Sequence, residues 1–133
     1  MVCYPPSRWQ PSRWDDLRET WQWRLVFGRN LGTALAAIET MEKHQRRLPD
    51  HWFLCYAAVA PDQQRRGVGS DLFTAVLDEC DRTNTPAYLE ANDTSRRVAA
   101  RHGFYDHGSI DLPQDGPAVY PMWREPGQRP IAT

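Results

Sequence analysis

Long apolar runs, an excess of basic charge and a leader-like start are all lacking in this chain of 133 residues. No stretch approaches the roughly 18 consecutive apolar residues of a membrane span, and the first ten residues lack the apolar core of a signal peptide. The net charge of −1 provides no overall basic field, so the composition offers no case for nucleic acid or an anionic membrane as a partner. We therefore expect a single domain, residues 1–133, in the cytoplasm.

The cysteines are too few for a disulfide framework. There are three, Cys3, Cys55 and Cys80, and their spacing is not that of metal ligands. Cys55 and Cys80 fall inside apolar strand or helix patterns, so we interpret both as small core residues and not as catalytic thiols. We expect no metal site.

The chain is organised around a strand, a turn and a helix predicted in residues 51–80. Residues 51–60, HWFLCYAAVA, form an apolar run of strand length that Pro61 closes. From Val68 to Cys80, apolar residues recur every three or four positions, which predicts a helix with one apolar stripe. The turn between them, residues 64–69, contains two glycines. Such a turn presents unpaired N–H groups and the positive end of the helix dipole, which favours phosphate binding.

The glycine turn alone fits several kinds of protein. A Rossmann fingerprint requires a third glycine where this chain has Leu72, and a P-loop requires a Gly-Lys-Ser/Thr sequence that is absent. Both absences disfavour a nucleotide-binding domain of these classes. The structural alternative is a turn that merely joins a strand to a helix.

Two helical patterns precede the organising stretch. Trp14, Leu17, Trp21 and Leu25 mark the first, and Leu31, Leu35, Ile38 and Met41 mark the second. We expect a break between them near Gly28. The chain begins with Val2-Cys3-Tyr4, a short apolar segment that we interpret as the tail of a strand.

The segments after the organising stretch complete an α/β domain. We predict a strand at residues 87–91. Because a helix connects it to the strand at 51–60, the two strands should be parallel. Residues 95–102 predict a short helix that Gly103 ends. Residues 104–112 and 118–124 predict an antiparallel pair joined by a proline- and glycine-containing turn, and the tail from residue 125 is expected to fray.

Two motifs together resemble the GNAT superfamily of acyl-CoA-dependent N-acyltransferases. The first is Gln/Arg-x-x-Gly-x-Gly after a strand that ends in Val-x-Pro. The second is similar to the family's Asn-x-x-Ala-x-x-Leu-Tyr-x-x-x-Gly-Phe. They are carried by Val59, Pro61, Gln64, Gly67 and Gly69, and by Asn92, Ser95, Val98, Ala99, Gly103 and Phe104.

The resemblance covers about residues 51–125 and implies a fold. The fold is α/β, a GNAT-like mixed sheet with a central parallel strand–helix–strand unit and a C-terminal antiparallel hairpin. Residues 51–125 would form the acyl-CoA-binding core, and residues 1–50 partial acceptor-side helices. We expect the family's usual first strands to be lacking before residues 1–50, which would leave an unpaired sheet edge. Such an edge invites pairing with another chain, so we expect a homodimer or poor solubility.

The resemblance also implies acetyl-CoA as the cosubstrate. In this family the strand before the glycine turn splays from its neighbour, and the pantetheine arm pairs in the gap. The turn would hold the pyrophosphate, and Asn92 would bind the pantetheine arm. The implied cofactor-binding residues are Val59, Ala60, Gln64, Arg65, Arg66, Gly67, Val68, Gly69, Ser70 and Asn92.

The implied reaction is attack of a primary amine, on a small molecule or a protein, on the thioester. It needs a base for the amine and a proton for the departing thiolate. The tyrosine that usually gives this proton is replaced by Ala99, so Tyr120, Tyr105 or Tyr88 would have to substitute, and Tyr120 is our candidate.

For the base, Glu90 is our first candidate because its predicted strand borders the cleft. His51 and Tyr56 follow it. An exposed carboxylate at a strand end is the structural alternative for Glu90. The replacement at Ala99 also motivates a second hypothesis, a non-catalytic or degenerate module that binds CoA or a partner. The sequence does not identify the acceptor amine.

Overall fold

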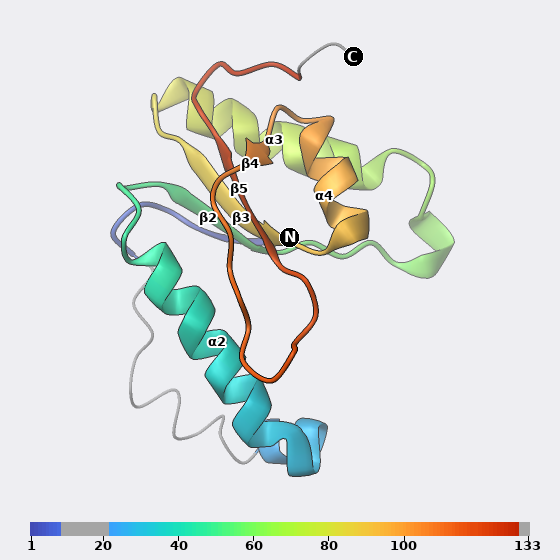
Figure 1. The fold of residues 1–133 in the computed structure, drawn as a ribbon. Coiled ribbons are helices and arrows are strands. Elements are labelled where there is room, and N and C mark those ends of the chain that lie inside the picture. Colours follow the sequence, from blue (N-terminus) through green and yellow to red (C-terminus); the bar gives the residue numbers. More distant parts are fainter. Residues whose placement is uncertain (9–21, 131–133) are drawn as a thin grey trace.

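The structure, a computed structural model, describes residues 1–8 and 22–130. They form a five-stranded sheet in the order β1-β2-β3-β5-β4 (Figure 1). Residues 22–27 are also helical, and the helix expected around Trp14 and Leu17 lies largely outside the described residues. The strands are β1 (Val2–Tyr4), β2 (Trp52–Tyr56), β3 (Ala87–Ala91), β4 (Tyr105–Asp106) and β5 (Tyr120–Arg124), and the helices are η1 (Gly28–Asn30), α2 (Leu31–Gln45), η2 (Pro61–Gln63), α3 (Val68–Arg82) and α4 (Asp93–Ala100).

The sheet is mixed, as predicted. β2 and β3 are parallel and α3 connects them, whereas β1 pairs antiparallel with β2, and β5 pairs antiparallel with both β3 and β4. The strand predicted over 104–112 is shorter than expected. It consists of β4 and an isolated bridge between Ile110 and Val119. Gly108 interrupts it with a φ of +84°, which is incompatible with an extended strand.

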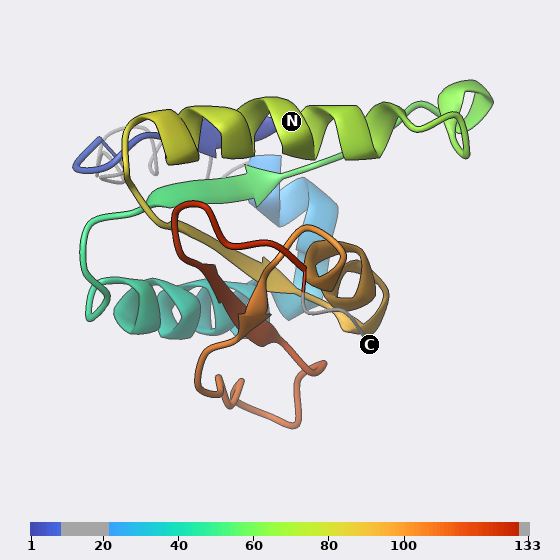
Figure 2. The same cartoon turned by 90° about the horizontal axis from the view of Figure 1, so that it is seen from above.

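Successive side chains of β3 point to opposite faces of the sheet, so the strand contributes to two cores, one on each face. Tyr88 packs with Phe53 and Trp123 on the face that α2 covers. Figure 2 shows α3 on one side of the sheet and α2 on the other. The cluster on the α3 side consists of Leu54, Leu77, Cys80, Ala87, Leu89, Ala91, Ala99, Phe104 and Met122.

The helix α2 is only partly in contact with the sheet. Its C-terminal end lies on it, where the rings of His44 and Tyr88 stack at 6.3 Å, and the N-terminal half extends past the sheet (Figure 1). The predicted apolar stripe is therefore not buried along its whole length, and Leu35 is 45% exposed. The break expected at Gly28 is present as η1, where Gly28 has a φ of +51°.

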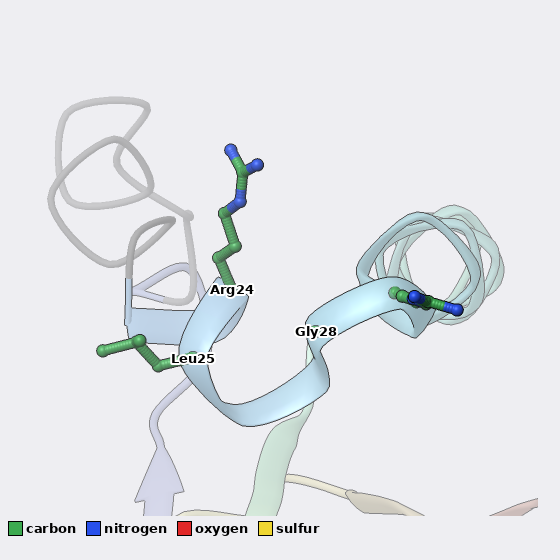
Figure 3. A pocket seen from close by; sticks show the side chains of 4 residues that line it. Arg24, Leu25 and Gly28 are labelled. Carbon is green, nitrogen blue, oxygen red and sulfur yellow. The ribbon is translucent and has the colours of Figure 1, made fainter.

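An open pocket lies beside this break, lined by Arg24, Leu25, Gly28 and Arg29. Figure 3 shows Arg24 and Leu25 projecting from the helical turn before Gly28. None of the predicted site residues lines it. Within the described ranges, no helix has the length and apolar character needed to cross a membrane.

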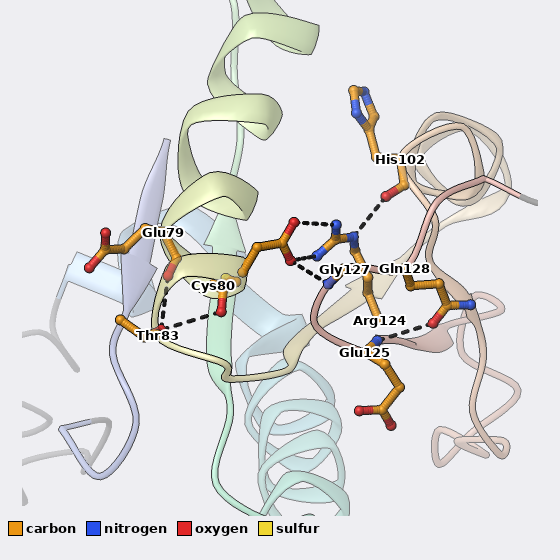
Figure 4. A network of polar contacts seen from close by, with 9 residues as sticks. Glu79, Cys80, Thr83, His102, Arg124, Glu125, Gly127 and Gln128 are labelled. Atoms are coloured by element: carbon orange, nitrogen blue, oxygen red, sulfur yellow. Dashed lines mark hydrogen bonds and ion pairs between the residues drawn. The ribbon is translucent and has the colours of Figure 1, made fainter.

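Residues 125–128 do not fray as expected, and residues 131–133 of the same predicted tail lie outside the described residues. Arg124 is buried and donates two hydrogen bonds to the carboxylate of Asp81 on α3, at 2.7 and 3.0 Å, and one to the carbonyl oxygen of His102 (Figure 4). The N–H of Gly127 donates to the same carboxylate at 2.7 Å. A Cβ on Gly103 would lie 2.7 Å from the carbonyl oxygen of Gln128, so the segment packs directly on this glycine. These contacts fasten residues 124–128 to α3 and to the end of α4.

Candidate active site

The two parallel strands diverge toward their carboxyl ends. β2 continues to Tyr56 and β3 to Ala91, yet they pair only at Trp52–Ala87 and Phe53–Tyr88. Neither strand frays, because β1 pairs with β2 up to Tyr56 and β5 pairs with β3 along its whole length. The divergence, visible in Figure 2, therefore leaves facing backbone groups of β2 and β3 without a strand partner among the described residues. Such an edge can pair with an extended ligand.

The glycine turn follows the loop after β2 and η2, and it opens α3. Gly67 is the N-cap of this helix and has a φ of +86°, a left-handed conformation that L side chains rarely adopt. The first intrahelical bond runs from the N–H of Asp71 to Gly67. The N–H groups of Val68, Gly69 and Ser70 thus have no acceptor within the helix, and the N-cap residue supplies no side chain to cap them. This arrangement suits an anionic group.

The loop between β2 and the turn contacts the start of α3. The strand ends earlier than predicted, at Tyr56, so Val59 and Ala60 lie in this loop. The side-chain amide of Gln64 donates to the carbonyl oxygen of Val59 at 3.1 Å. A Cβ on Gly69 would lie 3.6 Å from the Val59 side chain, an ordinary van der Waals distance, and Gly69 has no positive φ, so neither packing within the described residues nor the backbone requires glycine at this position. Gln64 therefore has a structural contact within the loop, which fixes the approach to the turn.

Polar side chains lie on the turn and at the start of α3. Arg65 and Arg66 are exposed, and Arg66 donates to the side-chain oxygen of Gln63 at 3.1 Å. The hydroxyl of Ser70 lies 3.3 Å from Nε2 of His102, whose ring stacks on Phe73 at 4.8 Å. Burial and the nearby Arg124 lower the pKa of His102, which favours its neutral form. The sequence patterns did not indicate His102, because its approach to α3 depends on how α4 packs.

Asn92 caps α4 through a capping box. Its side-chain oxygen accepts hydrogen bonds from the N–H groups of Thr94 and Ser95 at 3.1 and 2.9 Å. This cap explains why α4 begins at Asp93, two residues earlier than predicted. The oxygen is thus committed to the helix, and only the amide NH₂ remains for a ligand.

Glu90 projects from β3 toward the α2 side. The Tyr88 hydroxyl donates to its Oε1 at 3.0 Å. Burial raises the pKa of Glu90 to about 6, the charge of Glu42 adds to this rise, and the Tyr88 hydrogen bond opposes it. A carboxylate with a pKa near 6 is largely ionised at neutral pH and is a stronger base than an ordinary one.

Tyr120 lies on the opposite face of the sheet from Glu90. It pairs with Ala91 in the register between β3 and β5 and packs on the cluster beside α3 and α4. The guanidinium of Arg96 lies 4.2 Å from its ring centre. A hydrogen bond to Asp93 and the charge of that carboxylate raise the pKa of Tyr120, so the phenol keeps its proton. The structure thus places the two catalytic candidates on different faces.

The remaining candidates are less suited to catalysis. Tyr88 is fully buried, so its hydroxyl does not face solvent. Ala99, which stands where the family has its tyrosine, is 1% exposed within the α3-side core. His51 lies at the opposite end of β2 from the glycine turn, and burial lowers its pKa. Tyr105 packs against the cluster of Phe53, Tyr88 and Trp123. For Tyr56 the structure describes the backbone position alone, at the end of β2.

A match to a family model identifies the family to which this chain belongs. A model of the acetyltransferase (GNAT) family matches residues 2–104. The chain belongs to this GNAT family. The match begins at residue 2, so it includes β1 and α2 as well as the two motifs. Family membership supports acetyl transfer as the general activity.

A solved structure supports the same fold. A protein from Corynebacterium glutamicum, described as a histone acetyltransferase and related acetyltransferase, is 28% identical to this chain with a TM-score of 0.53. The match covers 62% of this chain and 45% of that protein, so this GNAT chain spans less than half of the relative's length.

Proposed function

We propose that the protein is an acyl-CoA-dependent N-acetyltransferase that acts on a primary amine of a small molecule or a protein. The observation that carries this proposal is the divergence of β2 and β3, which ends at a helix N-terminus with three free N–H groups. An extended arm with an anionic end matches this shape, and acetyl-CoA has both parts. Val68, Gly69 and Ser70 would hold the pyrophosphate through their N–H groups, with Gly67 shaping the turn.

The neighbouring residues complete the cofactor site. Arg65 and Arg66 would add positive charge beside the phosphates, and Gln64 would hold the rim. Val59 and Ala60 would present backbone groups to the pantetheine arm, and Asn92 would donate to it from its side-chain NH₂.

Glu90 would act as the general base. Its carboxylate borders the divergent end of β3 and has a raised pKa, so it can take the proton of an ammonium group before the amine attacks. The charge of Glu42 on α2 would help to attract a cationic acceptor.

Tyr120 would return a proton to the departing thiolate from the other face of the sheet. Its raised pKa keeps the phenol protonated until it is needed. Replacement of Tyr120 by Phe should lower kcat about tenfold or more without weakening acetyl-CoA binding. Unchanged kcat across pH 6–9 would remove Tyr120 from the mechanism.

The decisive experiment measures CoA release from acetyl-CoA with a panel of primary amines. Glu90→Gln should lower kcat by about 10²–10⁴-fold, with the acetyl-CoA dissociation constant unchanged by calorimetry. The matched control is Glu39→Gln, because Glu39 is an exposed carboxylate on α2 that pairs with Lys43. Acetyl-CoA binding without turnover for any amine would instead favour the non-catalytic CoA-binding module.

We also propose that the protein forms a homodimer through β1. This strand ends the sheet, and no strand among the described residues pairs with its outer side. Val2 on β1 is 46% exposed. Sedimentation equilibrium should give twice the monomer mass, and a monomer at micromolar concentration would contradict the proposal.

A further inference from the structure

The Tyr88 hydroxyl is a buried donor with a specific acceptor. Tyr88 has no exposed surface, and its hydroxyl donates to Glu90 Oε1 at 3.0 Å. Residues two apart on a strand lie on the same face, so β3 itself sets this pair side by side. Because a buried hydroxyl without an acceptor is costly, the carboxylate is required for the hydroxyl to be satisfied.

The ring of Tyr88 is held from several sides. His51 contacts it edge-on at 5.2 Å from the start of β2, and His44 stacks on it at 6.3 Å from α2. Phe53 and Trp123 lie 6.0 and 6.4 Å away on the two neighbouring strands. Because the ring is packed on these sides, the Tyr88 hydroxyl is held in one position next to Glu90.

The charged surroundings of Glu90 oppose ionisation. Glu42 faces it from α2, and Glu42 pairs at 3.7 Å with Arg46, at the end of the same helix. The imidazoles that flank Tyr88 do not offset this effect, because burial lowers the pKa values of both His44 and His51. His107 faces His44 from the loop after β4. The Tyr88 hydroxyl is thus the close donor that favours the charged carboxylate.

We propose that Tyr88 is a positioning residue, which fixes the Glu90 carboxylate in one orientation and stabilises its charged form through this hydrogen bond. The inference rests on the proposed role of Glu90 as general base. Tyr88 keeps its own proton throughout, and Glu90 accepts the proton of the acceptor amine. This assignment differs from the proton-donor role considered for Tyr88 from the sequence.

The test is Tyr88→Phe, which removes the hydroxyl and keeps the ring. Without the hydrogen bond, the charged form of Glu90 is less favoured, so the acidic limb of the kcat/KM profile should move to higher pH by about one unit. A carbon-13 titration of the Glu90 carboxyl should show the same shift. The acetyl-CoA dissociation constant should not change.

The matched control is Tyr4→Phe. Tyr4 packs on the same aromatic cluster and stacks on Phe53 at 6.4 Å, but it belongs to β1, which β2 separates from the strand that carries Glu90. This variant should leave both the profile and the titration in place. A Tyr88→Phe profile and titration that coincide with those of Tyr4→Phe would overturn the proposal.

Two further arms separate the possible failures. Glu90→Asp shortens the side chain by one methylene and so moves the carboxylate away from the Tyr88 hydroxyl. The acidic limb of its kcat/KM profile should also move to higher pH. This variant tests the proposal if the Tyr88→Phe protein is unstable. Full activity of Glu90→Gln would refute the base role itself. The carbon-13 titration does not depend on activity, so it would still report whether Tyr88 stabilises the charged carboxylate.

Discussion

The environment of Glu90 in the folded protein disfavours the charged form of its side chain. Its pKa is raised to about 6 from an ordinary 4.5, so the folded protein binds its proton more tightly than the unfolded chain does. The stability that this proton contributes is present below pH 4.5 and is lost as the pH rises through about 6. The site therefore lowers the stability of the fold at neutral pH, as expected of a functional group.

Replacement of Glu90 by Gln should stabilise the protein although it lowers kcat. At pH 8 the free energy of unfolding should rise by about 1–2 kcal/mol, and the gain should disappear near pH 4. Urea unfolding at the two pH values measures it. Glu79→Gln is the control with the opposite sign, because Arg82 lowers the pKa of Glu79. An equal effect of Glu90→Gln at both pH values would contradict the raised pKa.

Single residues differ in how far the sequence reveals them. Gly67 was predictable, since a glycine between a strand and a helix usually marks a turn that needs a left-handed backbone, and Glu90 followed from its place on the next strand. The partners of these residues were not predictable. Tyr88 meets Glu90 because they alternate onto a buried face, and the sequence alone does not say which face is which.

Among the elements, the turn that opens α3 should be the most sensitive to substitution. Gly67→Ala forces a side chain into a left-handed conformation, which costs about 1 kcal/mol and displaces the N–H groups. Acetyl-CoA affinity should fall at least tenfold in a calorimetric titration. Gly28→Ala is the matched control, because Gly28 also has a positive φ and an open Cβ position but lies at η1. Similar affinity losses in both variants would contradict a local role of the turn.

The hydrogen bonds of Arg124 at the end of α3 should stabilise the contact between α3 and β5 more than any other single polar group does. Arg124→Met removes the hydrogen bonds to Asp81 and to the carbonyl oxygen of His102, which leaves the Asp81 carboxylate with the Gly127 N–H, and should destabilise the protein by about 2–3 kcal/mol in urea unfolding. The exposed pair of Arg82 and Glu79 is the control, and Arg82→Met should cost no more than about 1 kcal/mol. Equal effects of the two substitutions would argue against this role of Arg124.

The elements also differ in predictability. The strand at 87–91 and the helix that starts at Val68 were predicted closely, because apolar periodicity and flanking turn residues mark them. α4 and the strand after it were placed less well. A capping box at Asn92 and a left-handed glycine at Gly108 set their limits, and the apolar pattern does not record such local hydrogen bonds and backbone angles.

The whole molecule combines a sheet that opens between two parallel strands with helices on both faces. The α3 face carries the glycine turn and Tyr120, and the α2 face carries Glu90. The sequence indicated the mixed sheet and the glycine turn. It could not place the two catalytic candidates on opposite faces, because this depends on strand register. Nor could it show that Leu35 stays exposed while Gln45 is buried.

Thermal unfolding of the purified protein with acetyl-CoA, free CoA or ATP tests the central claim most directly. A ligand at 100 times its dissociation constant stabilises a protein by about 2.7 kcal/mol, which raises Tm by several degrees in a domain of this size. We predict such a rise with acetyl-CoA and none with ATP, because ATP has no pantetheine arm to lie between β2 and β3. A cooperative transition that saturating acetyl-CoA does not move would contradict the account.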